Sequence, residues 1–321
     1  MSHLGLGPGP EFDRIRAIEK ALGASAGDLG DDCALILVGD EFIALSIDLS
    51  VEGVHFRREW LSLEEIGWKA AAGALSDLAA EAARPEGLLA SVGVPKGGDP
   101  GDVATVMRGV GEAVASVGGR VLGGDLSTAP VLTIDIAVVG RTARPVRRQG
   151  AQPGDGIWVT GELGGARAAL AAWSAGETPI TTARRSFAHP VPRIGAGLWL
   201  AERGAHALID LSDGLAGDAG HLAAASQVMV ELAIERVPLH GAVPAAASRA
   251  NQPPAVFAAL GGEDYELLVA MPRQFTSADA GALERELGIP LTLIGRVSTG
   301  SGSVCRMQGR EVPLTGYDHF A

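Results

Sequence analysis

The sequence LEEIGWKAAAGALSDLAAEAA, residues 63–83, predicts a long helix that carries an acidic side chain on an apolar face. Steps of four, three and four residues place these side chains on one side of the helix: Ile66, Ala70, Gly73 and Asp77. Because the other three are small or apolar, Asp77 is expected to point into an interface. A buried carboxylate must be paired, neutralised or bound to a metal ion. A hydrogen-bonded structural group and a metal ligand are therefore both open for Asp77.

Apolar runs on both sides of this helix predict an α/β fold. In the first half of the chain they predict helices over residues 11–22 and 101–117, and strands over 33–38, 42–47, 88–94, 120–122 and 131–141. Glycine and proline gather in residues 142–156, which we take as a domain boundary.

A second α/β unit follows this boundary. It has predicted strands over 157–160, 207–210, 228–234, 266–271 and 291–297, and predicted helices over 165–174, 192–202, 215–226 and 277–287. We therefore expect a disordered lead-in over residues 1–10, an N-terminal domain over 11–145 and a C-terminal α/β domain over 146–321.

The composition excludes several classes of protein. The chain has 321 residues and a net charge of −12, from 26 basic and 38 acidic side chains, which argues against nucleic acid or an anionic membrane as the main partner. No apolar run approaches the roughly 18 residues of a membrane span. The two cysteines, Cys33 and Cys305, lack metal-binding spacing and fit reduced thiols in a cytoplasmic protein.

Short acidic segments recur along the chain, and we interpret most of them as turns beside strand ends. They are Gly30-Asp31-Asp32, Ser46-Ile47-Asp48, Gly123-Gly124-Asp125, Asp210-Leu211-Ser212-Asp213-Gly214 and Gly261-Gly262-Glu263-Asp264. Hard oxygen ligands from distant segments are what Mg²⁺ needs when it also carries substrate phosphates. Each segment taken alone also fits an ordinary polar turn or a helix cap.

For three other residues, two interpretations of their role stay open. Arg147 and Arg148 fit either a solvated pair or a phosphate clamp, and His55 fits either a phosphate ligand or a structural hydrogen-bond donor. The chain has no G-x-x-x-x-G-K-[ST] phosphate loop, no kinase H-R-D or D-F-G set and no nucleophile elbow. Phosphoryl chemistry here would therefore need a site dominated by metal ions.

Seven segments, in order, resemble the thiamine-monophosphate kinase family, which belongs to the ATP-binding superfamily of aminoimidazole ribonucleotide synthetase and selenophosphate synthetase. The segments are 30–34, 46–56, 74–80, 123–125, 210–215, 262–267 and 316–320. Val-Glu-Gly-Val-His-Phe at 51–56 and Gly-Tyr-Asp-His-Phe at 316–320 are specific to this kinase within the superfamily. The resemblance implies a two-domain synthetase-like α/β (α+β) fold, with an N-terminal mixed-sheet domain that forms a homodimer and a C-terminal α/β sandwich.

The resemblance also implies residue roles. It assigns metal binding to Asp31, Ser46, Ile47, Asp48, Asp77, Asp125, Asp210 and Asp213. It assigns ATP binding to Gly124, Asp125, Arg148 and Ser212. It assigns thiamine-phosphate binding to His55, Glu263 and Tyr317. Ile47 offers only its carbonyl oxygen where the family often has Thr, and Met107 stands where the family often has Tyr. Which of Asp31 and Asp32 binds metal directly stays open.

The implied reaction is phosphorylation of thiamine monophosphate by ATP, assisted by several Mg²⁺ ions. The attacking phosphate oxygen is already largely ionised at neutral pH, so no residue is expected to act as a general base. One alternative is a sibling synthetase. Selenophosphate synthetase, however, requires a reactive N-terminal cysteine or selenocysteine, and no cysteine precedes Cys33 here. The chain also lacks the C-terminal cysteine of hydrogenase-maturation relatives. Another alternative is a non-catalytic divalent-cation-binding protein.

Overall fold

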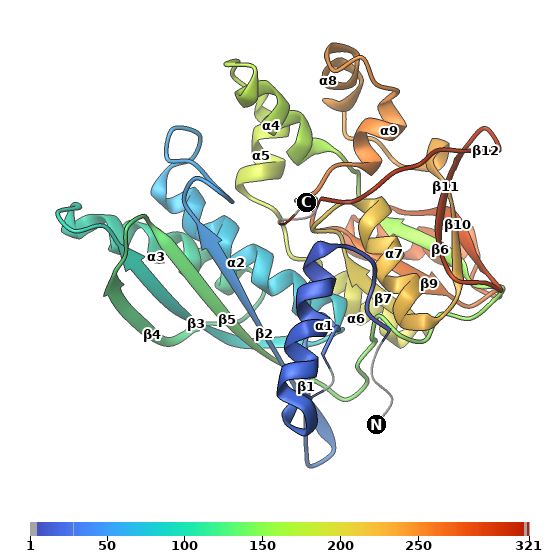
Figure 1. Ribbon diagram of the computed structural model, residues 1–321, viewed down its shortest axis with the longest axis horizontal. Coiled ribbons are helices and arrows are strands. Elements are labelled where there is room, and N and C mark those ends of the chain that lie inside the picture. The colour runs from blue at the N-terminus through green and yellow to red at the C-terminus, as the bar shows by residue number, and fades with distance from the viewer. Residues whose placement is uncertain (1–4, 28, 318–319, 321) are drawn as a thin grey trace.

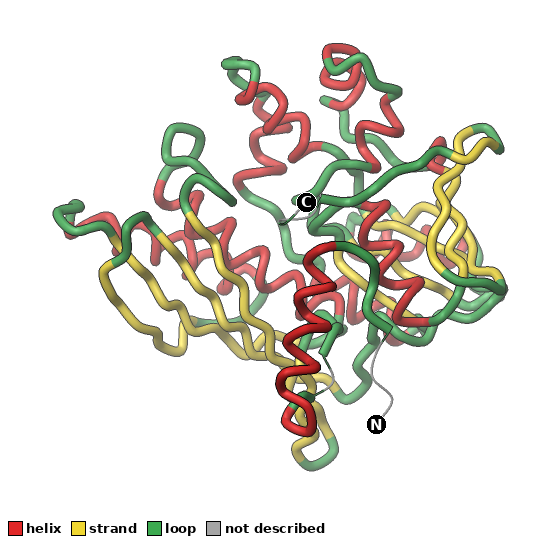
Figure 2. The backbone as a smooth tube through the Cα atoms, in the orientation of Figure 1, coloured by secondary structure: helices red, strands yellow, loops and turns green. Residues whose placement is uncertain are grey.

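The computed structural model describes residues 5–27, 29–317 and 320. Two β-sheets lie at opposite ends of the molecule, with helices packed between and around them (Figures 1 and 2). The α/β architecture with a mixed N-terminal sheet, expected from the sequence, is confirmed. Among the described residues, no helix combines the length and apolarity needed to cross a bilayer.

The first sheet has five strands in the order β1-β2-β5-β3-β4. Their bounds are β1 Ala34–Val38, β2 Glu41–Val51, β3 Arg84–Val94, β4 Val121–Thr128 and β5 Thr133–Thr142. Neighbouring strands are antiparallel except for β3 and β4, which are parallel. Helices α2 (Leu63–Ala80) and α3 (Pro100–Ser116) pack against one face of this sheet (Figure 1).

The other face of the first sheet carries a group of exposed apolar side chains, with charged residues such as Asp135 and Arg141 beside them. Strand register places Ile36 of β1 beside Ile43 of β2, and Ile47 of β2 in one row with Leu89 of β3. The side chain of Ile47 is 66% exposed, and these large apolar side chains are exposed with it: Ile36, Val38, Leu49 and Leu89. We call these five side chains the open sheet face. Groups of exposed apolar side chains are often sites of association.

Helices α2 and α3 cross at close range because glycine lies at each contact. A Cβ atom on Gly67 would lie 1.9 Å from the carbonyl oxygen of Val106, and one on Gly109 would lie 1.8 Å from that of Glu64. Ser62 starts α2 with a capping box, in which its hydroxyl accepts from the Glu65 amide while the Glu65 carboxylate accepts from the Ser62 amide.

The second sheet has seven strands in the order β12-β11-β8-β10-β6-β9-β7. Their bounds are β6 Gly156–Thr160, β7 Ala207–Asp210, β8 Met229–Ala233, β9 Leu267–Met271, β10 Leu291–Ser298, β11 Gly302–Met307 and β12 Arg310–Glu311. The helices of this half are α4 Gly165–Ser174, α5 Thr181–Ala188, α6 Ile194–Glu202, α7 Leu215–Ser226, α8 Val243–Arg249, α9 Pro254–Ala259 and α10 Ser277–Leu287. Of these, α7 packs against β7, β8 and β11, and α10 packs against β10.

Helix α2 joins the two halves of the molecule. One part of its surface packs on β2 and β5, and another part packs on α5, α6 and β7. The contact with α6 is close, because a Cβ atom on Gly197 would lie 2.1 Å from the carbonyl oxygen of Ala79. Side chains on α2 that point between the sheets are therefore shared by both halves, and Asp77 is one of them.

The structure corrects several local predictions. Gly123-Gly124-Asp125 lies inside β4 and is not a turn, since β4 pairs with β3 through residue 128. Helix α2 ends at Ala80 and not at residue 83. Ala82, just beyond its end, takes a positive φ of 50°. Helices α5, α8 and α9 and strands β11 and β12 were not predicted, because each is short or lacks a clear apolar period.

The two ends of the chain return to the body of the molecule. Residues 1–10 are expected to be a disordered lead-in; residues 1–4 lie outside the described part, whereas Gly5 and Gly7 pack on α7 and Pro10 begins α1 (Pro10–Leu22). After β12 the chain runs back to the centre of the molecule (Figure 2), where the Tyr317 amide donates to the carbonyl oxygen of Asp213 at 2.9 Å. Residues 318 and 319 of the closing motif lie outside the described residues.

Candidate functional site

Three carboxylates from distant parts of the chain meet between the sheets. Asp32 precedes β1, Asp77 lies on α2 and Asp210 ends β7, and one oxygen from each lies within 4.8 Å of the other two. The Ser46 hydroxyl of β2 donates to the Asp77 carboxylate at 2.5 Å. We call Asp32, Asp77 and Asp210 the carboxylate cluster. Its donors are hard oxygens of the kind that bind Mg²⁺.

The cluster is strained electrostatically without a cation. Burial and repulsion from Asp48 and Asp210 hold the pKa of Asp77 well above its ordinary value. Burial and repulsion from Asp32 raise the pKa of Asp210 to about 8. Asp48, on the rim of the site, has its pKa raised to about 6 by desolvation and by Asp135. A divalent cation reverses this pattern because it favours the ionised form of each carboxylate, so the donor set fits Mg²⁺.

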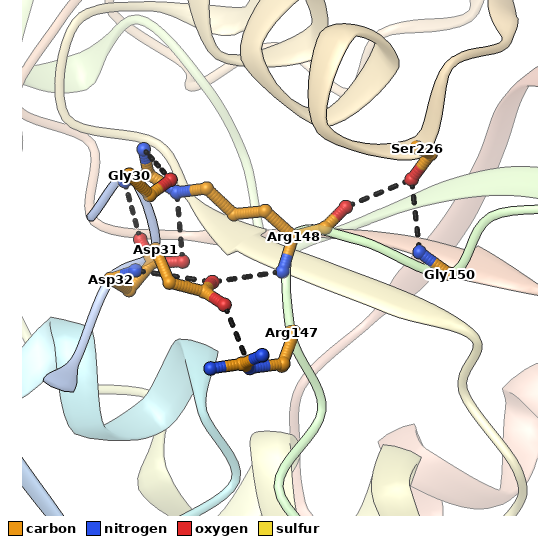
Figure 3. Close-up of polar contacts among 7 residues, drawn as sticks. All are labelled: Gly30, Asp31, Asp32, Arg147, Arg148, Gly150 and Ser226. Atoms are coloured by element: carbon orange, nitrogen blue, oxygen red, sulfur yellow. Dashed lines mark hydrogen bonds and ion pairs between the residues drawn. The ribbon is translucent and has the colours of Figure 1, made fainter. Parts of the chain in front are cut away.

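Two arginines support the cluster from the domain junction. The Arg148 guanidinium donates to both oxygens of Asp32, at 2.8 and 3.0 Å, and its backbone amide donates to Asp31 at 3.0 Å (Figure 3). Asp31 also pairs with Arg147 at 3.1 Å. The Ser226 hydroxyl of α7 donates to the Arg148 carbonyl oxygen at 2.9 Å. Asp32 thus lies in the cluster, while Asp31 is directed at the arginines.

A polar cavity of about 210 Å³ opens beside the cluster. Its lining brings together half of the residues assigned from the sequence: His55, Asp48, Asp77, Asp210, Ser212, Asp213 and Glu263. A second, larger cavity of about 510 Å³ adjoins it; its lining includes apolar and aromatic side chains, among them Tyr317, and two arginines, Arg57 and Arg167. Four residues line both cavities: His55, Ser212, Asp213 and Glu263. The pair can therefore hold a molecule that is polar at one end and ring-like at the other.

Sequence reasoning missed Lys69, although a signal for it was present. Lys69 lies four residues before Gly73 and eight before Asp77, which puts it on the same side of α2. It lines the polar cavity, is only 5% exposed and pairs with Glu263. Burial lowers the pKa of its ammonium group to about 7, whereas the Glu263 carboxylate favours the charged form.

Some assigned residues lie outside the polar cavity. Gly124 and Asp125 lie on β4, the edge strand of the first sheet, and Ile47 is on the open sheet face. Asp125 of β4 pairs with Ser91 of β3, and Ser91 pairs in turn with Asp135 of β5. Asp125 and Asp135 are therefore two strands apart, about 10 Å at the usual strand spacing. Gly124 also has a packing reason to be glycine, since a Cβ atom there would lie 1.9 Å from the carbonyl oxygen of Ala90.

Two further polar groups flank the cavities. The ring nitrogen Nδ1 of His55 accepts from the Val51 amide at 3.0 Å, which orients the ring toward both cavities. A second acidic group joins Asp213 to Asp218 and His221, with ligand atoms within 4.8 Å of one another. Sequence reasoning did not single out Asp218, which is buried at the start of α7 and accepts from the Gly214 amide.

Comparison with known proteins places these features in one family. Residues 30–142 match the AIR synthase related protein N-terminal domain, and residues 152–308 match its C-terminal domain. The chain is 32% identical to thiamine-monophosphate kinase of Aquifex aeolicus, over 97% of this chain and 98% of that protein. It is 33% identical to the Escherichia coli K12 thiamine-monophosphate kinase, over 97% and 96% of the two chains. A solved structure of AaThiL complexed with AMPPCP and TMP superimposes with a TM-score of 0.86, at 31% identity and 97% coverage of both chains.

Proposed function

The chain belongs to the thiamine-monophosphate kinase family, and we propose that the two adjoining cavities are where it phosphorylates thiamine monophosphate with ATP. The products are thiamine diphosphate and ADP. The single observation that carries the location is the carboxylate cluster at the end of the polar cavity, next to a larger cavity that suits a ring.

The carboxylate cluster would hold Mg²⁺. We assign Asp77 and Asp210 as ligands, with Asp48, Asp213 and the Ser46 hydroxyl around them. When bound, Mg²⁺ neutralises phosphate charge and bridges phosphates to carboxylates. Asp31 and Asp125 stay in the proposed metal set, and the geometry favours Asp32 over Asp31 as the closer ligand. The carbonyl oxygen of Ile47 completes that set.

ATP would bind toward the first sheet and the domain junction. Gly124 and Asp125 on β4, Arg148 at the junction and Ser212 after β7 are the proposed contacts. In the structure the Arg148 guanidinium is paired with Asp32. It would therefore either contact the nucleotide phosphates after that pair rearranges, or act on them at a distance with Asp32 in between.

Thiamine monophosphate would occupy the larger cavity, with its phosphate directed at the polar one. Tyr317 can stack on the cationic ring of thiamine. His55 and Glu263 line both cavities and so would flank the linker between ring and phosphate. The acceptor phosphate carries its own negative charge at neutral pH, and no side chain is required to remove a proton from it. The protein instead orients the two phosphates in line and limits access of water.

The open sheet face supports a homodimer. Five large apolar side chains from β1, β2 and β3 share one exposed surface on a sheet that carries its helices on the other side. A two-fold copy of this face would bury them, as isologous dimers do. The edge strand β4, with Gly124 and Asp125, borders this face, so the proposed ATP contacts would lie near the partner.

The test is ADP release by the purified protein with thiamine monophosphate as acceptor, with and without Mg²⁺, and with the product identified by mass. Mg²⁺-dependent formation of thiamine diphosphate is expected. ATP binding without that product would reject thiamine monophosphate as the acceptor while leaving an ATP-dependent sibling reaction to be tried.

A further inference from the structure

A buried lysine lies where the two cavities meet. Lys69 lines the polar cavity, and its partner Glu263 lines both cavities. The ammonium nitrogen is 4.2 Å from the centre of the Phe187 ring, which lines the larger cavity, and 5.5 Å from the centre of the Tyr265 ring. Lys69 therefore stands at the boundary that a substrate spanning both cavities must cross.

The ionisable side chains around Lys69 in the polar cavity are mostly acidic. The polar cavity is lined by six carboxylates: Glu11, Asp48, Asp77, Asp210, Asp213 and Glu263. Among the described residues that line it, Lys69 is the one lysine or arginine. A phosphate entering this cavity meets repulsion on most sides, and Lys69 is the cation that the protein itself supplies there.

The Lys69 ammonium group also has unsatisfied hydrogen-bond donors. A lysine carries three N–H donors, and the ion pair with Glu263 occupies one direction. Among the described residues, no hydrogen bond takes up the remaining donors, although the side chain is 5% exposed. The Phe187 ring bounds the ammonium on a further side, so the unused donors need a partner that enters through the cavity.

We propose that Lys69 binds the phosphate of thiamine monophosphate at the junction of the two cavities, an assignment that rests on the proposed function and deepens it. Glu263 holds the ammonium in place through the ion pair, and the phosphate supplies the acceptors that the protein lacks. The protein's own cation then offsets part of the charge of the acceptor phosphate, while the carboxylate cluster serves the metal-bound nucleotide. Lys69 thus contributes to choosing a phosphorylated over an unphosphorylated acceptor.

The competing role is purely structural, with Lys69 serving only to neutralise and position Glu263. The two roles differ in which ligand senses the side chain. A phosphate contact affects thiamine monophosphate and has no counterpart in thiamine, which lacks the phosphate. Loss of a structural pair disturbs Glu263 and the larger cavity, and so affects both ligands alike.

The experiment compares binding of thiamine monophosphate and of thiamine to wild type, Lys69→Met and the control Lys20→Met, by calorimetry with Mg²⁺ and a non-hydrolysable ATP analogue. Lys20 is an exposed lysine of α1. We expect Lys69→Met to weaken thiamine monophosphate binding about 10- to 100-fold, the range of a lost charge-assisted hydrogen bond. Thiamine binding should stay within about twofold. Unchanged binding of thiamine monophosphate, or equal weakening of both ligands, would overturn the proposal.

Two further variants guard against a folding artefact. Lys69→Arg keeps the charge and should retain most of the preference for thiamine monophosphate over thiamine. The double variant Lys69→Met/Glu263→Gln leaves no unpaired buried charge, and it should still lose that preference relative to Glu263→Gln alone; an equal preference in these two proteins contradicts the assignment. The wild-type assay separates the levels: absence of turnover rejects the proposed function, whereas turnover with an unaffected Lys69→Met rejects only the role of Lys69.

Discussion

Replacing Asp210 with Asn removes one carboxylate from the cluster, and we expect it to abolish activity while making the metal-free protein more stable. The pKa of Asp210 rises from 3.8 to about 8 in the fold, so the native state binds its proton more tightly than the unfolded chain does. The resulting cost is absent below pH 3.8, grows as the pH rises and is complete above pH 8. It amounts to about 5 kcal/mol at pH 8 and about 2 kcal/mol at pH 5.

The observed gain will be smaller than this cost. The pKa of about 8 already includes the attraction of Arg148 for the carboxylate, but the amide of Asn replaces a protonated carboxyl group imperfectly, at a cost of about 1–2 kcal/mol. We therefore expect Asp210→Asn to stabilise the metal-free protein by about 3–4 kcal/mol at pH 8, or roughly 4–6 °C in Tm, and to have little effect at pH 5.

The assay is thermal unfolding in EDTA at pH 5 and pH 8, repeated with Mg²⁺ and ATP. Asp40→Asn, at an exposed turn, is the matched control and should change neither curve. Mg²⁺ and ATP should stabilise wild type more than the variant, because the variant lacks one ligand. A variant that is destabilised in EDTA at both pH values, or whose gain does not depend on pH, would refute the electrostatic reasoning.

Four other outcomes are expected. Asp77→Asn should lower turnover at least about 100-fold with unchanged circular dichroism, and a variant that keeps most of its activity would remove Asp77 from the metal site. Tyr317→Ala should raise KM for thiamine monophosphate about tenfold through loss of ring stacking, with KM for ATP unchanged; steady-state kinetics in both substrates decides this. Leu89→Asp, on the open sheet face, should turn a dimer into a monomer in sedimentation velocity, and identical sedimentation of both proteins would speak against this face as the interface. Gly109→Ala should cost about 1–3 kcal/mol in urea unfolding, because its Cβ atom would lie 1.8 Å from the Glu64 carbonyl oxygen, whereas Gly111→Ala, which meets open space, should not be destabilising.

The α/β class and the family resemblance could be read from the sequence because they rest on local signals. Apolar period and glycine or proline breaks locate helices and strands, and the spacing of Gly73 and Asp77 on α2 fixes their common direction. Lys69 shares that direction, but a lone lysine in a helix is usually solvated, so sequence spacing alone did not single it out. The acidic segments likewise indicate oxygen-ligand chemistry from the sequence alone.

Local signals could not show which side chains meet. Asp32 and Asp77 come together only because β1 and α2 pack around one space, and Asp31 turns away because Arg147 arrives from the domain junction. Gly123-Gly124-Asp125 has the composition of a turn, yet pairing with β3 makes it a strand.

The sequence by itself determined the element pattern, the kind of chemistry and the family. Only the tertiary structure decided which carboxylates form the cluster and that Lys69 faces Glu263 beside two aromatic rings. The physical reason is that helical and strand periods act over a few residues, whereas burial, charge pairing and pKa depend on neighbours brought together from more than a hundred residues away.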